Sequence, residues 1–178
     1  IQNAIRDSEE VLYVDTTNFV SDWNSAHLIQ SSSKEAHLKL ILEKRTRMRD
    51  ALSGNAWLFI TFGTSIAYRH ISKDLVVANC HKQQAELFRK ESSSPFDMFT
   101  KWSEFIKELI EWNPKLNIVF TVSPVRHVRD GLIENNKSKA RLFMLIEKLM
   151  EAHPVSYYPS FEIPVSYTHL RAHETGSY

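Results

Sequence analysis

The chain has 178 residues, of which 43% are hydrophobic and 24% charged, enough apolar side chains to fill the core of one soluble domain. Lysine plus arginine number 22 and aspartate plus glutamate 21, and the net charge of +1 excludes a protein that grips nucleic acid with a basic surface. Cys80 is the only cysteine, which excludes a disulfide framework, and no apolar run approaches the roughly 20 residues of a membrane-spanning helix.

The N-terminal part of the sequence contains one regular segment. The first thirty residues have weak periodicity, and we expect turns there with a short helix around residues 18–23. Ser32 and Glu35 then have the spacing of a capping box, and apolar side chains recur on one helical face after them. Gly54 supplies the residue that most easily follows a helix in a left-handed conformation. These signals predict a helix over residues 33–52.

Strand and helix patterns alternate through the rest of the chain. Residues 57–62 and 117–122 are apolar on both faces, as in strands buried within a parallel sheet, and residues 155–158 form a shorter strand. Apolar stripes at helical spacing predict helices over residues 94–113 and 137–152. This alternation is typical of an α/β fold, and we expect a three-layer α/β/α arrangement with a mainly parallel sheet and helices on both faces.

Small and polar residues follow each predicted strand. The three clusters are Gly63-Thr64-Ser65, Ser123-Pro124-Val125-Arg126-His127 and Pro159-Ser160-Phe161-Glu162. Because ligands bind at the carboxyl ends of the strands in open α/β sheets, these clusters predict a site at one edge of the sheet. Between the first two clusters, a short apolar run is followed by four chemically reactive or polar residues, Asn79, Cys80, His81 and Lys82.

Each of these features also has a purely structural interpretation. The first cluster fits a simple turn and lacks the further glycines of a phosphate loop, so we reject nucleotide binding. Arg126 and His127 could pair with Asp130. Cys80 is either an inert buried thiol or a nucleophile whose pKa a neighbouring histidine would have to lower. His70, Cys80, His81 and His127 lack the paired spacing of a zinc site, so we expect no metal and no cofactor.

Several segments together resemble the GSCFA family, a bacterial group similar to the SGNH hydrolases. The matching segments span about Asp15 to Ile163 and are most specific in two runs, Val77-Ala78-Asn79-Cys80-His81-Lys82 and Phe120-Thr121-Val122-Ser123-Pro124-Val125-Arg126-His127. Others are Phe59 to Tyr68, Asp130-Gly131, Glu134-Asn135, Ser138-Lys139-Ala140 and Tyr157 to Ile163.

The resemblance implies a flavodoxin-like fold and an ester- or acyl-hydrolase site. In SGNH-like enzymes an N-terminal serine attacks, a C-terminal Asp-x-x-His activates it, and glycine and asparagine hold the oxyanion. Gly63 and Asn79 match those supporting donors. The implied substrate is a small-molecule or carbohydrate ester, and its candidate contacts are Thr64, His81, Lys82, Arg126, His127, Ser138 and Lys139.

The family's two catalytic blocks are absent from the sequence, which has no Gly-Ser-Cys-Phe-Ala segment and no Asp-x-x-His after Ile163. We therefore expect residues 1–163 to be a partial domain truncated at both ends of its active site. Residues 164–178 have no periodicity that continues the fold and resemble translated sequencing-adapter DNA, so we interpret them as a non-native tail and do not count His169 and His173 as catalytic.

Three hypotheses about function follow from these observations. The chain is part of a serine ester hydrolase and inactive as given, or a non-catalytic module that binds a carbohydrate or an anion through Arg126, His81 and Lys139, or a structural remnant. The missing serine block separates them, because hydrolysis requires it and binding does not.

Overall fold

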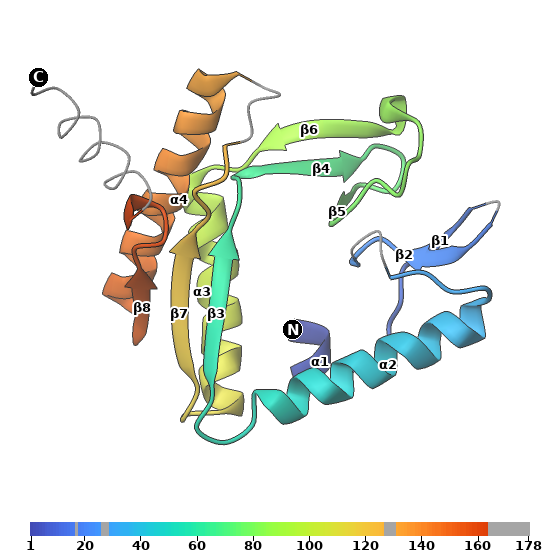
Figure 1. Cartoon of the computed structure of the whole chain (residues 1–178), viewed down its shortest axis with the longest axis horizontal. Coiled ribbons are helices and arrows are strands. Elements are labelled where there is room, and N and C mark those ends of the chain that lie inside the picture. The colour runs from blue at the N-terminus through green and yellow to red at the C-terminus, as the bar shows by residue number, and fades with distance from the viewer. Residues whose placement is uncertain (17, 26–28, 127–130, 164–178) are drawn as a thin grey trace, which may run out of the picture.

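A computed structural model of the protein describes residues 1–16, 18–25, 29–126 and 131–163 (Figure 1). Its helices are α1 (Gln2–Ile5), α2 (Lys34–Ala51), the 3₁₀ helix η1 (Ala85–Leu87), α3 (Pro95–Trp112) and α4 (Leu132–Ala152). Its strands are β1 (Tyr13–Asp15), β2 (Val20–Asp22), β3 (Trp57–Phe62), β4 (Ile66–His70), β5 (Leu75–Val77), β6 (Phe88–Ser92), β7 (Asn117–Val122) and β8 (Val155–Tyr158).

The central element is a three-stranded parallel sheet with the strand order β3-β7-β8. Trp57 pairs with Asn117 at one end of β3 and Phe62 with Val122 at the other, while Ile118 pairs with Val155 of β8. α4 connects β7 to β8. The α/β fold class and the three parallel strands predicted from the sequence are confirmed.

Both long C-terminal helices pack on one face of this sheet. Phe120 and Val122 of β7 are fully buried against Leu109 of α3 and against Leu142 and Leu145 of α4. Alternate residues of β3 join the same core. Because each large apolar side chain removed from water contributes about 1.5–3 kcal/mol, this layer provides most of the stabilisation of the fold.

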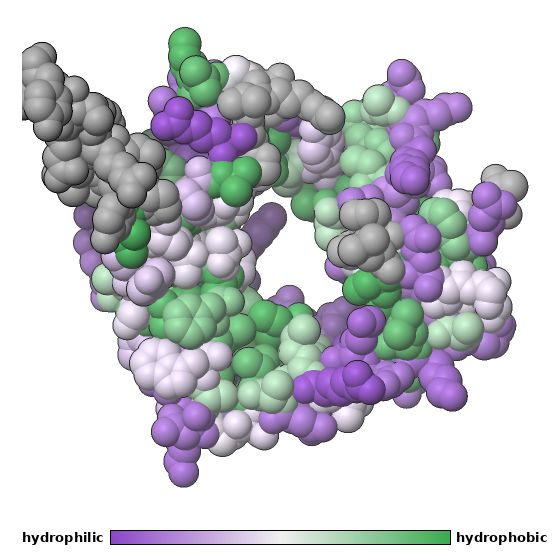
Figure 2. Space-filling view, in the orientation of Figure 1, coloured by the Kyte–Doolittle hydropathy of each residue, from purple (hydrophilic) through white to green (hydrophobic). Residues whose placement is uncertain are grey.

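The opposite face of the sheet is exposed. Trp57 is 63% and Phe59 58% exposed, their rings stack with centroids 6.4 Å apart, and Tyr158 of β8 lies exposed on the same face. The prediction that residues 57–62 are buried on both faces is therefore wrong. α2 runs away from the sheet, so among the described residues the second helical layer does not cover β3 (Figure 1). Figure 2 shows apolar surface over the parallel sheet, beside an open gap in the molecule.

A second, antiparallel sheet with the order β5-β4-β6 occupies the segment where no element was predicted. Tyr68 pairs with Val77 and Ile66 with Ser92. One face of this sheet carries Leu75, Val77 and Phe88, which pack on the buried Trp23 ring. The N-terminal hairpin β1-β2 thus forms a separate small core with the antiparallel sheet.

The helix predictions are largely confirmed, with corrections at their starts. α2 is capped by Ser33 rather than Ser32, because the Ser33 hydroxyl accepts the Ala36 N–H at 3.2 Å. α4 begins at Leu132, directly after Gly131 in a left-handed conformation (φ +86°), and not at Lys137. The short helix expected over residues 18–23 is wrong, since this segment pairs with β1 as strand β2.

Candidate functional site

The carboxyl ends of the parallel strands are held together by Lys139 of α4. Its ammonium group donates to the carbonyl of Gly63 after β3 and to that of Ser123 after β7, both at 2.7 Å. It also lies 6.0 Å from the ring centroid of Phe161, which follows β8. The side chain is buried, and this burial lowers the pKa of Lys139. One cation therefore links the ends of all three strands.

Ser138, the residue before Lys139 in α4, hydrogen-bonds to the loop that follows β3. Its hydroxyl oxygen accepts the backbone N–H of Ser65 at 2.7 Å and lies 2.9 Å from the Thr64 hydroxyl. Ser138 is buried and Thr64 is exposed. We call the group Gly63, Thr64, Ser65, Ser123, Ser138 and Lys139 the strand-end site.

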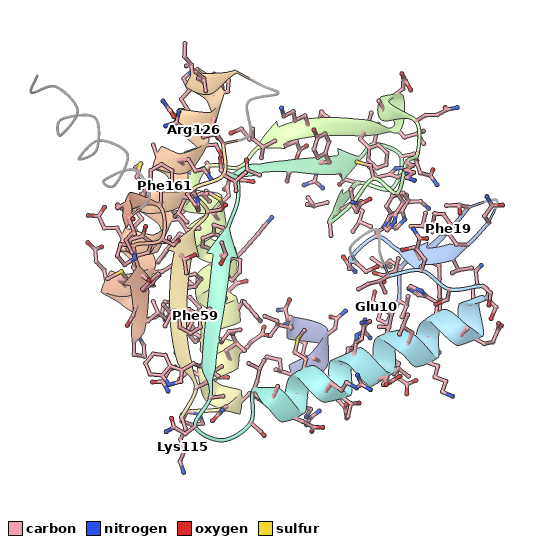
Figure 3. The ribbon with its side chains drawn as sticks, viewed as in Figure 1. Glu10, Phe19, Phe59, Lys115, Arg126 and Phe161 are labelled. Atoms are coloured by element: carbon pink, nitrogen blue, oxygen red, sulfur yellow. The ribbon has the colours of Figure 1, made fainter. Side chains whose placement is uncertain are left out.

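Arg126 and His127 were predicted to belong to the same edge. Arg126 is exposed in the loop after β7, and Figure 3 places it at the end of the sheet where Phe161 also lies. His127 and Asp130 lie outside the described residues.

Asn79, His81 and Lys82 form a second group, in a tight turn after β5. The Ala78 N–H donates to the Trp23 carbonyl at 2.8 Å, which ties the chain after β5 to the residue that follows β2. His81 and Lys82 then adopt left-handed conformations with φ of +49° and +57°. For residues other than glycine this conformation costs about 1–2 kcal/mol each, so surrounding contacts must hold the turn.

His81 provides the main contact that holds this turn. Its Nε2 lies 2.8 Å from the Asp22 carbonyl, and its buried ring meets the Trp23 ring edge-on at 5.8 Å. Because a carbonyl oxygen can only accept, Nε2 carries the proton. His81 is thus tied to β2 and not to the strand-end site.

The turn fixes the orientation of the Asn79 amide. Its Oδ1 accepts the His81 backbone N–H at 2.7 Å, which identifies the oxygen and turns the Nδ2 group away. Within the described ranges, Nδ2 has no hydrogen-bond partner. The side chain is half-buried. An amide N–H held in place and left unpaired is the kind of donor that stabilises a developing oxyanion.

Comparison with protein-family models gives a match to the GSCFA family over residues 1–174. The chain belongs to the GSCFA family. No curated protein and no solved structure matches it. The match takes in Asn79 and Lys139, and it also takes in residues 164–174; the interpretation of residues 164–178 as a non-native tail stays a prediction. No helix in the described part of the chain is long and apolar enough to cross a membrane.

Cys80 of this GSCFA chain lies in the same turn, half-buried, and burial raises the pKa of its thiol. A raised pKa disfavours the nucleophilic thiolate, and the neighbouring His81 already donates its Nε2 proton to Asp22. The inert-thiol interpretation fits this geometry better than the nucleophile. Among residues 1–16, 18–25, 29–126 and 131–163, no group of three or more metal-ligating side chains could hold an ion.

The sequence reasoning missed a buried pair next to the Asn79 turn. Asp22 Oδ2 lies 3.2 Å from Nε2 of His37, a fully buried residue of α2 whose ring faces Tyr13 edge-on. Asp22 therefore joins His37 through its side chain and His81 through its carbonyl. No signal in the sequence pairs residues 22 and 37, because the contact depends on how α2 packs on β2.

Proposed function

We propose that this GSCFA chain contributes the oxyanion-stabilising side of an SGNH-like serine ester or acyl hydrolase site. The observation that carries the proposal is the Asn79 amide, whose oxygen is fixed by His81 in a strained turn while its nitrogen remains free to donate. Membership of the GSCFA family supports it.

The proposed chemistry is acyl transfer through a tetrahedral intermediate. A serine hydroxyl attacks the ester carbonyl carbon and passes its proton to a histidine, and the carbonyl oxygen becomes an oxyanion. Asn79 Nδ2 and the backbone N–H of Gly63 donate to that oxygen. Collapse of the intermediate expels the alcohol, which takes the proton from the histidine, and water then releases the acid by the same steps.

Topology supports a shared role for Gly63 and Asn79. β4 leaves the Gly63 loop, and β5 returns antiparallel to it with Val77 opposite Tyr68. Up to Val77 the chain therefore runs back along β4 in the direction of the Gly63 loop.

The proposed substrate contacts divide by exposure. Thr64, Lys82 and Arg126 are exposed and are proposed to touch a small-molecule or carbohydrate ester, together with His127. His81, Ser138 and Lys139 are buried and are proposed to position the loops that carry those contacts.

A non-catalytic module that binds an anion or a carbohydrate is the second candidate function. The observation that favours it is the exposure of two cationic side chains, Lys82 and Arg126, for which no ion pair exists among the described residues. Binding of this kind would need no nucleophile.

The test is steady-state hydrolysis of p-nitrophenyl acetate by a full-length GSCFA protein that carries this sequence. Asn79→Ala is expected to lower kcat by about 10²–10³ with little change in KM, because the lost donor acts on the transition state. Asn136→Ala, an exposed asparagine of α4, is the matched control. Unchanged kcat in Asn79→Ala would remove Asn79 from the oxyanion site.

A further inference from the structure

A cavity of about 770 Å³ adjoins the strand-end site. It lies between the antiparallel sheet and the first turns of α3, and Thr64 and Ser65 line it where it adjoins the strand ends. The sheet contributes Ala67 and Val76, and α3 contributes Phe96, Met98 and Trp102.

The register of the antiparallel sheet explains why the face that lines the cavity is not covered by the small core around Trp23. Side chains alternate between faces along a strand, so Ala67, Arg69 and Val76 lie on the face opposite to Val77 and Phe88. The latter face is packed on Trp23. In the described part of the chain, α3 lies across from the face with Ala67 and Val76, and the cavity occupies the space between.

Three of the four charged residues that line the cavity are engaged with other groups of the protein, and the fourth is Lys101. The guanidinium of Arg69 forms salt bridges with the Glu91 carboxylate at 3.0 Å and with the Asp74 carboxylate at 3.2 Å. The Asp97 carboxylate accepts the Ser94 hydroxyl at 2.7 Å. Because these three groups already have partners, the apolar side chains of Ala67, Val76 and Phe96 are the main surface that the wall offers to a ligand between them.

Two apolar side chains of the wall are strongly exposed to water. Phe96 is 74% and Val76 39% exposed although both line the cavity. Covering them with an apolar group would remove this area from water and so favour binding. A cavity of this size, lined by apolar side chains together with polar groups, has the form of a small-molecule site.

We propose that this cavity holds the acyl group of the ester, an aliphatic or aryl chain of medium length whose carbonyl lies at the Thr64 end. This inference rests on the proposed function, because it assigns the substrate class of the same site. An aliphatic or aryl chain fits the exposed apolar side chains of Val76 and Phe96, whereas a sugar would compete with the existing partners of Arg69, Glu91 and Asp97.

The test is a titration of the 178-residue chain with n-alkanoates from butanoate to decanoate, followed through the methyl chemical shifts of Ala67 and Val76. Affinity is expected to rise roughly four-fold per methylene, as burial of each CH₂ predicts, until the cavity is filled. Cellobiose is expected not to shift these methyls. Affinity independent of chain length, or cellobiose shifting the methyls in place of the alkanoates, would overturn the proposal.

Two variants distinguish binding in the cavity from nonspecific binding to exposed apolar surface. Val76→Glu places a charge in the apolar wall and is expected to weaken octanoate binding at least ten-fold. Ile71→Glu makes the same kind of change at an exposed apolar residue outside the cavity and is expected to leave binding unchanged. Equal losses in two folded variants, checked by circular dichroism, would contradict the assignment.

The outcomes also separate this inference from the proposed function. If the full-length protein hydrolyses no ester while octanoate still binds at Val76, the hydrolase proposal fails and the cavity remains an acyl-binding site. If Asn79→Ala abolishes hydrolysis while alkanoates do not bind, the acyl site fails and the oxyanion assignment stands.

Discussion

Replacement of Lys139 by methionine is expected to destabilise the protein substantially. The change removes two charge-assisted hydrogen bonds of 2.7 Å, to the carbonyls of Gly63 and Ser123, while it keeps most of the side-chain volume. Hydrogen bonds to charged groups contribute about 1.5–3 kcal/mol each, and part of this is offset because the buried ammonium no longer has to be desolvated. We therefore expect a net loss of roughly 2–4 kcal/mol in the free energy of unfolding.

Thermal unfolding followed by circular dichroism measures this loss. For a chain of this length each kcal/mol lowers Tm by about 2–4 °C, so Lys139→Met is expected to melt roughly 4–16 °C below the parent. Lys148→Met, an exposed lysine of the same helix, is the matched control and should change the free energy of unfolding by less than about 0.5 kcal/mol. Equal Tm values for the two variants would refute the role of Lys139 as the link between the strand ends.

Three further predictions follow from groups outside the strand-end site. Burial, together with the hydrogen bond to Glu162, raises the pKa of Tyr157 above its usual 10.0, so the folded state keeps that proton longer and stability falls as pH rises above 10. Tyr157→Phe should flatten this alkaline slope in urea unfolding, and parallel slopes would contradict it. Hydrogen bonds from Arg6, then from Gln2, lower the pKa of Glu108 below 4.5. The ionised carboxylate therefore stabilises the folded state above pH 4.5, and this stabilisation is lost as the pH falls through the lowered pKa. For this partly exposed pair it amounts to at most about 1 kcal/mol. Glu108→Gln should therefore lower Tm more at pH 7 than at pH 3, and an equal effect at both would count against the pair. Finally, the exposed Phe59 on edge strand β3 predicts concentration-dependent self-association in sedimentation velocity, reduced by Phe59→Lys, whereas a monomeric parent at all concentrations would rule it out.

The elements that the sequence predicts well are those whose signals are local. Ser94 and Pro95 mark the start of α3, and the apolar stripe that follows faces the core as expected. β7 is an apolar run buried in the middle of the parallel sheet. In both cases the residues that define the element also pack against it.

The elements that sequence reasoning missed depend on tertiary contacts. In the antiparallel sheet, Ala67, Arg69 and Glu91 face a cavity, so its strands lack a clear alternation of buried and exposed apolar residues. β3 has the composition of a buried strand, yet among the described residues it pairs only with β7 and its Trp57 and Phe59 side chains are exposed.

The sequence singles out Asn79 and Lys139 as candidates, but the geometry around them is not encoded in any spacing. The Asn79 amide is oriented by a left-handed turn that His81 ties to β2, and the Lys139 ammonium is directed at two carbonyls from different strands. His37 gave no signal because the hydrogen-bond partner of its ring within the described ranges is Asp22, which lies on β2.

Sequencing of the source DNA outward from the Asp15 and Ile163 codons would show whether this chain belongs to a serine hydrolase. We expect a genuine reading frame with Gly-Ser-Cys-Phe-Ala before Asp15 and Asp-x-x-His after Ile163. Its protein product should hydrolyse p-nitrophenyl acetate, whereas the 178-residue chain should not. A genuine frame that ends where this sequence ends, or robust hydrolysis by the 178-residue chain itself, would contradict it. The first result would favour a binding module, and the second would return Cys80 to consideration as the nucleophile.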